Sequence, residues 1–166
     1  MTASLADRLA ALSFLDRTAD EVTGLLVESV TAWAREQGWR VYPGARSVLP
    51  LPPPYEHRFS TLDVACARPA GAPIVIEVDA TDRQRTVDKL RAEAAAGRIA
   101  IWVRWGTGTV VPPPLPVRLV TCAVTSRKGV GGRGRLYFRL PASDRPAPPH
   151  TATGTAVEQR PGLFTD

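Results

Sequence analysis

The chain has 166 residues, a formal net charge of +5 and 44% hydrophobic residues, values that fit one globular domain with a substantial core. No apolar run reaches the roughly 18 residues that a membrane span needs, and the N-terminus lacks the basic and apolar blocks of a secretory signal. Cys66 and Cys122 are the only cysteines, and no cysteine or histidine spacing matches a zinc site. We therefore expect a cytoplasmic protein with two buried, reduced thiols and no membrane association.

The N-terminal part of the chain predicts two helices before the first strand. Residues 3–16 carry leucines at helical spacing, which predicts a short helix. The Thr-Ala-Asp-Glu sequence that begins at Thr18 is a capping box, and a longer helix is expected from there to about Gln37. Residues 39–42 alternate as a first strand does, and the prolines of segment 50–54 predict a loop, because proline donates no hydrogen bond to a sheet.

Two strands at the centre of the chain carry acidic side chains. Residues 62–64 and 74–79 predict strands joined by a turn that contains proline and glycine. Side chains alternate along a strand, so Glu77 and Asp79 share one face, and antiparallel pairing brings Asp63 level with one of them. Carboxylates this close repel one another unless a cation lies between them. The stretch therefore predicts a divalent-metal site on Asp63, Glu77 and Asp79.

The following segments predict the rest of a mixed sheet. A helix is expected from Thr81 or Asp82 to Ala96, and the apolar run 99–105 predicts a central strand. A strand, a helix and a strand in this order indicate a right-handed crossover between parallel strands. Two more strands are expected at the end of this region, over residues 117–124 and 135–140.

These elements together predict an α/β fold in which helices flank a mixed β-sheet. The elements fill a single domain over residues 1–140. From residue 141 to residue 166 the chain is rich in proline, alanine and threonine and has little periodicity, which predicts a disordered tail.

The basic residues of the chain are concentrated in its second half. No aspartate or glutamate occurs between Ala94 and Ser143. A flexible loop predicted over residues 127–134 lies inside this span, and its neighbourhood offers Arg127, Lys128, Arg133 and Arg135 as nucleic-acid contacts. An ordinary solvated basic surface is the alternative. The glycines of this loop do not form a phosphate-binding P-loop, because no helix is predicted after them.

The order of elements from Thr18 to Trp105 resembles the PD-(D/E)XK nuclease superfamily, which has the restriction-endonuclease-like fold. In that family the aspartate of one strand and the acidic residue of the next hold Mg²⁺, which implies Asp63 and Glu77 as ligands. The family usually has lysine two residues after the glutamate, where this chain has Asp79. The resulting Glu-Val-Asp sequence is similar to the very-short-patch-repair endonuclease branch, although the further histidine signature of that branch is missing.

The resemblance implies a metal-dependent nuclease that hydrolyses nucleic acid, with DNA as the first candidate substrate and Mg²⁺ or Mn²⁺ as cofactor. Asp63 and Glu77 would bind the ion, and Asp79 would add a ligand or orient the attacking water. Some members of the family carry the lysine on the following helix, which implies a catalytic role for Lys89. Others use a glutamate from the first core helix, for which Glu28 is the candidate.

Other interpretations of the same residues remain open at this point. The chain fits a catalytically inactive nuclease-fold module that binds nucleic acid or a protein partner in a larger assembly, and a homodimer is also open. A third interpretation is an interaction protein whose proline-rich loops bind aromatic grooves. In these cases Asp63 and Glu77 would be structural carboxylates paired with Arg40 or Arg104, and Lys89 would be an exposed helix lysine.

Overall fold

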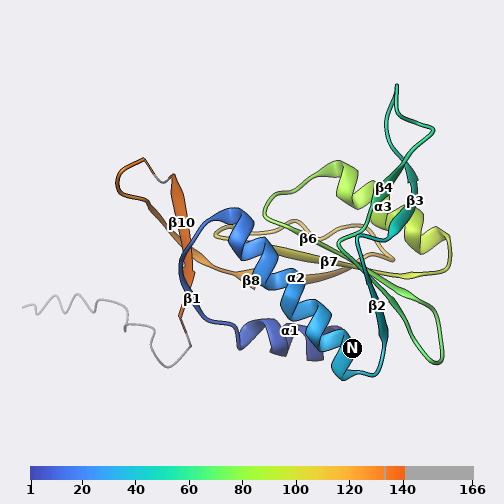
Figure 1. The fold of residues 1–166 in the computed structure, drawn as a ribbon, viewed down its shortest axis with the longest axis horizontal. Coiled ribbons are helices and arrows are strands. Elements are labelled where there is room, and N and C mark those ends of the chain that lie inside the picture. Colours follow the sequence, from blue (N-terminus) through green and yellow to red (C-terminus); the bar gives the residue numbers. More distant parts are fainter. Residues whose placement is uncertain (133, 141–166) are drawn as a thin grey trace, which may run out of the picture.

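The computed structural model describes residues 1–132 and 134–140, and its centre is a five-stranded sheet (Figure 1). The predicted α/β fold with a mixed sheet flanked by helices is confirmed. The first three strands in spatial order pair antiparallel and the last three pair parallel. In spatial order the strands are β2 (Arg40–Pro43), β5 (Val64–Ala67), β6 (Ile74–Asp79), β7 (Ile99–Gly106) and β8 (Arg118–Ala123).

Helices cover both faces of this sheet. On one face, α1 (Thr2–Ala10) and α2 (Ala19–Glu36) pack on a large core that includes Trp33 and Trp105. On the other face, α3 (Gln84–Ala95) packs on a smaller core around Leu90. The sheet is therefore the middle layer of three (Figure 1). Side chains alternate along β6, so they point toward α2 or toward α3 according to their position on the strand.

Several predicted elements have the expected form. The capping box at Thr18 starts α2, because the Thr18 hydroxyl accepts from the Glu21 N–H and the Glu21 carboxylate accepts from the Thr18 N–H. The crossover from β6 through α3 to β7 joins parallel strands, as predicted. Strand β7 lies between two neighbours, which explains its nearly continuous apolar sequence.

The N-terminal prediction was wrong between residues 11 and 16. Helix α1 ends at Ala10, and residues Phe14–Arg17 form β1 instead. This strand pairs with β10 (Arg135–Arg139), which also pairs with β9 (Thr125–Lys128), so a second sheet of three strands forms. The partner of β1 lies more than a hundred residues away in the chain, so the local spacing of leucines could not predict this pairing.

A hairpin that the sequence did not predict projects beside α3 (Figure 1). It consists of β3 (Arg46–Pro50) and β4 (Phe59–Thr61), and the proline-rich segment 50–54 lies at its outer end. The expected strand over residues 62–64 was also wrong at its start. The chain turns after β4, so Leu62 packs with the α3-side core while Val64 begins β5 in the opposite core.

The predicted tail over residues 141–166 lies outside the described residues, as does Arg133. Within the described part of the chain, every helix is too short or too polar to cross a membrane.

The carboxylate of Glu93 joins the projecting hairpin to α3. It is fully buried and accepts hydrogen bonds from the Ser47 hydroxyl (2.6 Å) and the Val48 N–H (2.7 Å), and it also contacts the Arg98 guanidinium. Removing the carboxylate leaves three donors without their partner, and a buried donor without a partner is costly.

We predict that Glu93→Ala lowers the free energy of unfolding by about 3 kcal/mol, because it breaks a buried ion pair and its hydrogen bonds. Chemical denaturation measures this loss. Glu36→Ala is the control, since Glu36 is exposed and pairs with Arg8 on the surface, where an ion pair contributes about 1 kcal/mol or less. Equal effects of the two substitutions would contradict the structural role of Glu93.

Candidate active site

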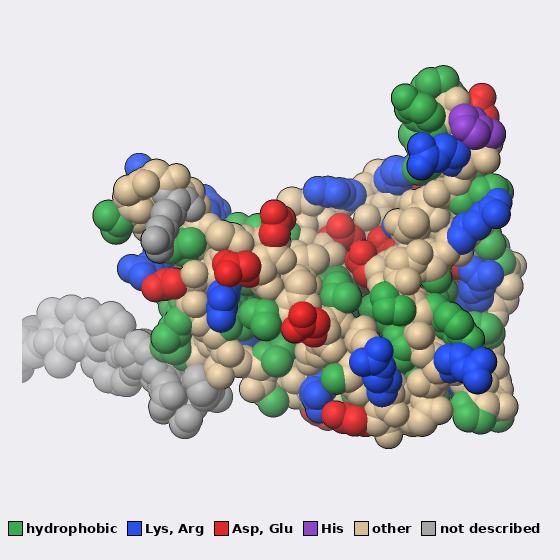
Figure 2. Space-filling view, in the orientation of Figure 1, with side chains coloured by type: hydrophobic (Ala, Val, Ile, Leu, Met, Phe, Trp, Pro, Cys, Tyr) green, Lys and Arg blue, Asp and Glu red, His purple; other side chains and the backbone are tan. Residues whose placement is uncertain are grey.

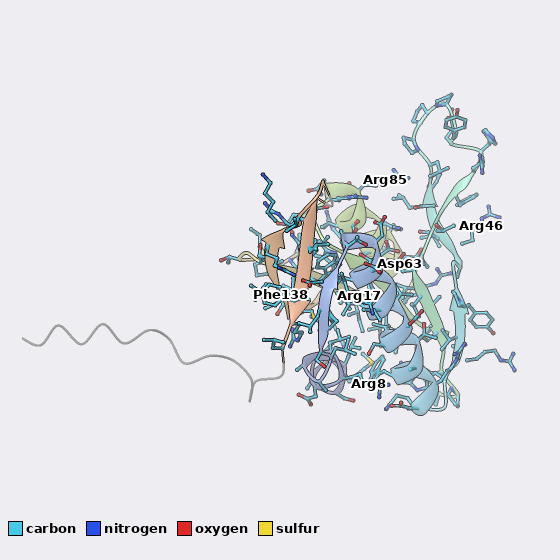
Figure 3. The ribbon with its side chains drawn as sticks, turned by 60° about the vertical axis from the view of Figure 1, so that its left-hand side comes forward. Arg8, Arg17, Arg46, Asp63, Arg85 and Phe138 are labelled. Carbon is cyan, nitrogen blue, oxygen red and sulfur yellow. The ribbon has the colours of Figure 1, made fainter. Side chains whose placement is uncertain are left out.

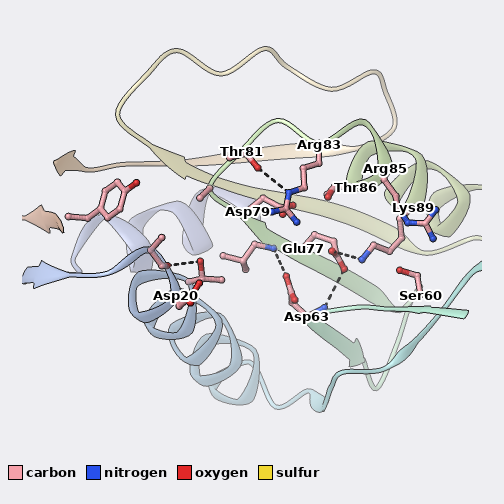
Figure 4. A pocket seen from close by; sticks show the side chains of 15 residues that line it. Asp20, Ser60, Asp63, Glu77, Asp79, Thr81, Arg83, Arg85, Thr86 and Lys89 are labelled. Carbon is pink, nitrogen blue, oxygen red and sulfur yellow. Dashed lines mark hydrogen bonds and ion pairs between the residues drawn. The ribbon is translucent and has the colours of Figure 1, made fainter. Parts of the chain in front are cut away.

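The three acidic residues predicted from the sequence line one open pocket of about 680 Å³ (Figure 4). The pocket lies at the end of β6, where α2, α3, β4 and β10 meet it. Asp63, Glu77 and Asp79 lie in its wall together with Lys89. The space-filling view shows acidic side chains in the hollow between the hairpin of β3 and β4 and the paired strands β9 and β10 (Figure 2).

Asp63 and Glu77 are neighbours because of the register between β5 and β6. Val64 pairs with Ile76, so the residue before Val64 lies beside the residue after Ile76. The Asp63 carboxylate accepts a hydrogen bond from the Val78 N–H (2.8 Å), and the Asp63 N–H donates to the Glu77 carboxylate (3.3 Å). Strand β5 begins just after Asp63, whose side chain makes the hydrogen bond to β6 that a strand starting earlier would make with its backbone.

Lys89 reaches the same place from α3. Its ammonium group donates to the Glu77 carboxylate (2.6 Å) and to the Thr61 carbonyl oxygen (2.7 Å). Glu77 is 4% exposed and Lys89 is 8% exposed, so this is a buried ion pair. The expectation of an exposed helix lysine was therefore wrong. The pairing of Glu77 with Arg40 or Arg104 was wrong as well, since Arg104 pairs with Asp82 instead.

Asp79 completes the acidic side of the pocket, but it has a separate anchor. Its carboxylate accepts a hydrogen bond from the Trp102 indole N–H (3.1 Å). Over residues 1–132 and 134–140, no three acidic, cysteine or histidine side chains lie close enough together to form a ready metal cage. Glu28 is exposed and does not line the pocket.

The donor set of this pocket nevertheless fits a hard divalent cation. Carboxylate oxygens are the ligands that Mg²⁺ and Mn²⁺ prefer. Asp63 and Asp79 each use one carboxylate oxygen in a described protein hydrogen bond, and both residues line the pocket. An ion held by Asp63 and Glu77 would compete with Lys89 for the Glu77 oxygen.

Burial and repulsion from neighbouring carboxylates raise the pKa of both Glu77 and Asp63. Desolvation is the largest cause for both residues, and it raises the pKa of Glu77 from 4.5 to about 7. The Lys89 ammonium opposes this shift, whereas Asp63 and Asp79 add to it. The pKa of Asp63 is raised too, again chiefly by desolvation. Both carboxyl groups therefore hold a proton more tightly than an exposed carboxyl group does.

Sequence reasoning missed most of the polar wall around the carboxylates. Arg83 and Arg85 lie at the start of α3, and Thr86 follows them in its first turn. The sequence could have indicated these three residues, because they follow closely after β6 and the pocket lies at the end of that strand. The other polar residues that sequence analysis did not include are Asp20, Thr23, Ser60, Thr81 and Tyr137.

The predicted basic loop is in fact a β-hairpin. Arg127 and Lys128 lie on β9, and Arg135 lies on β10, which pairs antiparallel with β9. Arg127 pairs with Asp16 (2.5 Å), while Lys128 and Arg135 are exposed. The T-shaped contact of Tyr137 with Trp105 joins this hairpin to the main sheet, with ring centroids 5.0 Å apart. In Figure 3, Asp63 lies between the sheet that carries Phe138 and the hairpin that carries Arg46.

Comparison with protein-family models found no match, and comparison with curated protein sequences found none either.

The raised pKa of Glu77 predicts a pH dependence of stability. Between about pH 4.5 and pH 7 the folded state retains a proton that the unfolded state has lost, so stability is lost as the pH rises through about 7. We predict that in EDTA the melting temperature of Glu77→Gln falls less than that of the wild type between pH 5 and pH 8, by a few degrees. Thermal unfolding over this pH range, with Glu28→Gln as control, measures the difference. Parallel curves for all three proteins would show that Glu77 does not titrate in this window.

Proposed function

We propose that the protein is a metal-dependent nuclease of the PD-(D/E)XK type that hydrolyses phosphodiester bonds in nucleic acid, with DNA as its first candidate substrate. The observation that supports this most is the grouping of Asp63, Glu77 and Lys89 in one pocket, from the turn before β5, from β6 and from α3. Two carboxylates and a lysine are the groups that metal-assisted phosphodiester hydrolysis needs. The usual lysine position of the family, two residues after the glutamate, is occupied by Asp79. Lys89 on α3 would supply the missing ammonium group.

Asp63 and Glu77 would hold Mg²⁺ or Mn²⁺, since the two residues are adjacent and both line the pocket. When bound, such an ion would acidify a water molecule and neutralise charge on the phosphate. Asp79 is fixed by Trp102 and keeps one oxygen free to orient the attacking water. Lys89 can donate to the charge that develops on the phosphate oxygens as water adds to phosphorus and the P–O bond breaks.

The second candidate is an inactive module of the same fold that binds nucleic acid or a protein. Two observations favour it. The Lys89 ammonium group already donates to the Glu77 carboxylate at 2.6 Å. The described residues also contain no group of three side chains that could hold a metal ion. A lysine that permanently replaces the cation would give a stable fold without catalysis.

Cleavage assays separate these two functions. We predict that supercoiled DNA, linear DNA or single-stranded RNA is cut in Mg²⁺ or Mn²⁺ and not in EDTA. Asp63→Asn and Glu77→Gln should each lower the rate by at least about 100-fold, because each loses a charged metal ligand without a change of shape. Glu28→Gln, which removes a carboxylate outside the pocket, should cleave as the wild type does. An absence of cleavage under all metal conditions, with no divalent ion detected by calorimetry, would favour the inactive module.

The basic hairpin gives a prediction on binding. Lys128 and Arg135 are exposed, whereas the charge of Arg127 is shared with Asp16. We predict that Lys128→Ala and Arg135→Ala each reduce the slope of log affinity against log salt by about 0.9 on duplex DNA, and that Arg127→Ala reduces it less. Arg133, which the sequence assigns to the same interface, lies outside the described residues. Arg40→Ala on the outer strand of the main sheet is the control, and slopes equal to that control would remove this hairpin from the interface.

A further inference from the structure

One side of the pocket carries donors that the proposed hydrolysis does not use. Arg83, Arg85 and Thr86 lie at the start of α3 and line the pocket beside the carboxylates (Figure 4). Ser60 lines it from β4. Guanidinium and hydroxyl groups recognise phosphate oxygens, and a planar guanidinium contacts them with two parallel N–H groups.

The two arginines are held in place without being neutralised. The Arg85 guanidinium donates to the Pro50 carbonyl oxygen (2.9 Å), and the Arg83 guanidinium donates to the Thr81 hydroxyl (3.1 Å). Neither forms an ion pair with any described residue, although four carboxylates line the same pocket, those of Asp20, Asp63, Glu77 and Asp79. Five other described arginines pair with acids, namely Arg8, Arg17, Arg98, Arg104 and Arg127. Arg91 lacks such a partner as well, but it lines a different hollow. Arg83 and Arg85 therefore keep both their charge and most of their N–H donors for a ligand.

Thr86 provides an independent observation. It is 6% exposed, yet its hydroxyl makes no hydrogen bond with any described protein atom, and the residue lines the pocket. The Thr86 hydroxyl is not among the fully buried side-chain groups that lack a partner, which in the described residues are limited to Ser29 Oγ. It is therefore reached by solvent and can contribute a hydrogen bond to a ligand that enters the pocket.

We propose that Arg83, Arg85 and Thr86 form a phosphate subsite that binds one phosphodiester group of a nucleic-acid strand, next to the phosphate that the carboxylates and Lys89 address. This inference rests on the proposed function and adds a positioning site to it. A strand fits better than a free phosphate because the pocket is open between two hairpins (Figure 2). Exposed basic residues extend the positive charge on both sides, including Arg58 between β3 and β4 and Arg135 on β10. The contact between Arg85 and Pro50 also fixes one of these hairpins to the subsite.

The experiment measures binding without catalysis. Labelled single-stranded and duplex DNA of the same sequence are titrated with protein in EDTA over a range of salt concentrations. Arg83→Ala and Arg85→Ala should each weaken binding about tenfold, because each loses charge-assisted hydrogen bonds. Arg91→Ala is the matched control, since Arg91 is an exposed arginine of the same helix that lines a different hollow. It should bind within about twofold of the wild type.

Thr86 supplies a readout that a structural role would not give. Thr86→Val removes a hydroxyl that has no partner in the protein, so the melting temperature should stay the same or rise while binding weakens about threefold. Thr86→Ser keeps the hydroxyl and should restore binding. A loss of melting temperature in Thr86→Val with unchanged binding would overturn the assignment of Thr86.

The subsite is refuted if Arg83→Ala, Arg85→Ala and Thr86→Val all bind as Arg91→Ala does. It is also refuted if inorganic phosphate raises the melting temperature of the wild type while neither DNA binds. The proposed hydrolysis can fail separately. If the protein binds DNA through Arg83 and Arg85 but never cleaves it, the subsite is supported and the nuclease activity is refuted. If the protein cleaves DNA and all three variants bind it fully, the nuclease activity is supported and the subsite is refuted.

Discussion

The buried ion pair between Glu77 and Lys89 is the interaction on which the pocket depends. It joins β6 to α3, and Lys89 also donates to the Thr61 carbonyl oxygen at the end of the projecting hairpin. A buried carboxylate without a counter-charge would be strongly destabilising, because desolvation penalises its charged form. Lys89 thus allows Glu77 to remain on a buried strand beside Asp63. The same pair sets the central question of function, since a metal ion and Lys89 would compete for the same carboxylate.

Charge is distributed over this molecule in a way that suits a polyanion. Carboxylates form the floor of the pocket, while uncommitted arginines lie on its α3 side and exposed basic residues lie on the hairpin opposite. The floor alone would repel a phosphate, and the basic surroundings would attract one. In the proposed nuclease, a bound divalent ion would make the charge at the base of the pocket positive. In the proposed inactive module, Lys89 would permanently neutralise part of the negative charge there.

The sequence predicted the parts of the fold that local patterns determine. The capping box at Thr18, the apolar run of β7 and the crossover through α3 all follow from short-range rules. It failed where long-range pairing decides, as in β1, which forms only because β10 is available as its partner. For the site, strand alternation brought Asp63 and Glu77 together correctly. The burial of Lys89 and the separate anchoring of Asp79 by Trp102 depend on how α3 and β7 pack, which no spacing in the sequence contains.

The most direct test of the central claim is the location of Mn²⁺ by anomalous diffraction from crystals of the wild-type protein soaked in that ion. The proposed metal centre predicts one anomalous peak bounded by the carboxylates of Asp63 and Glu77, with the Lys89 ammonium no longer in contact with Glu77. An anomalous map without a peak in this pocket, with the pair between Lys89 and Glu77 intact, would contradict the metal centre.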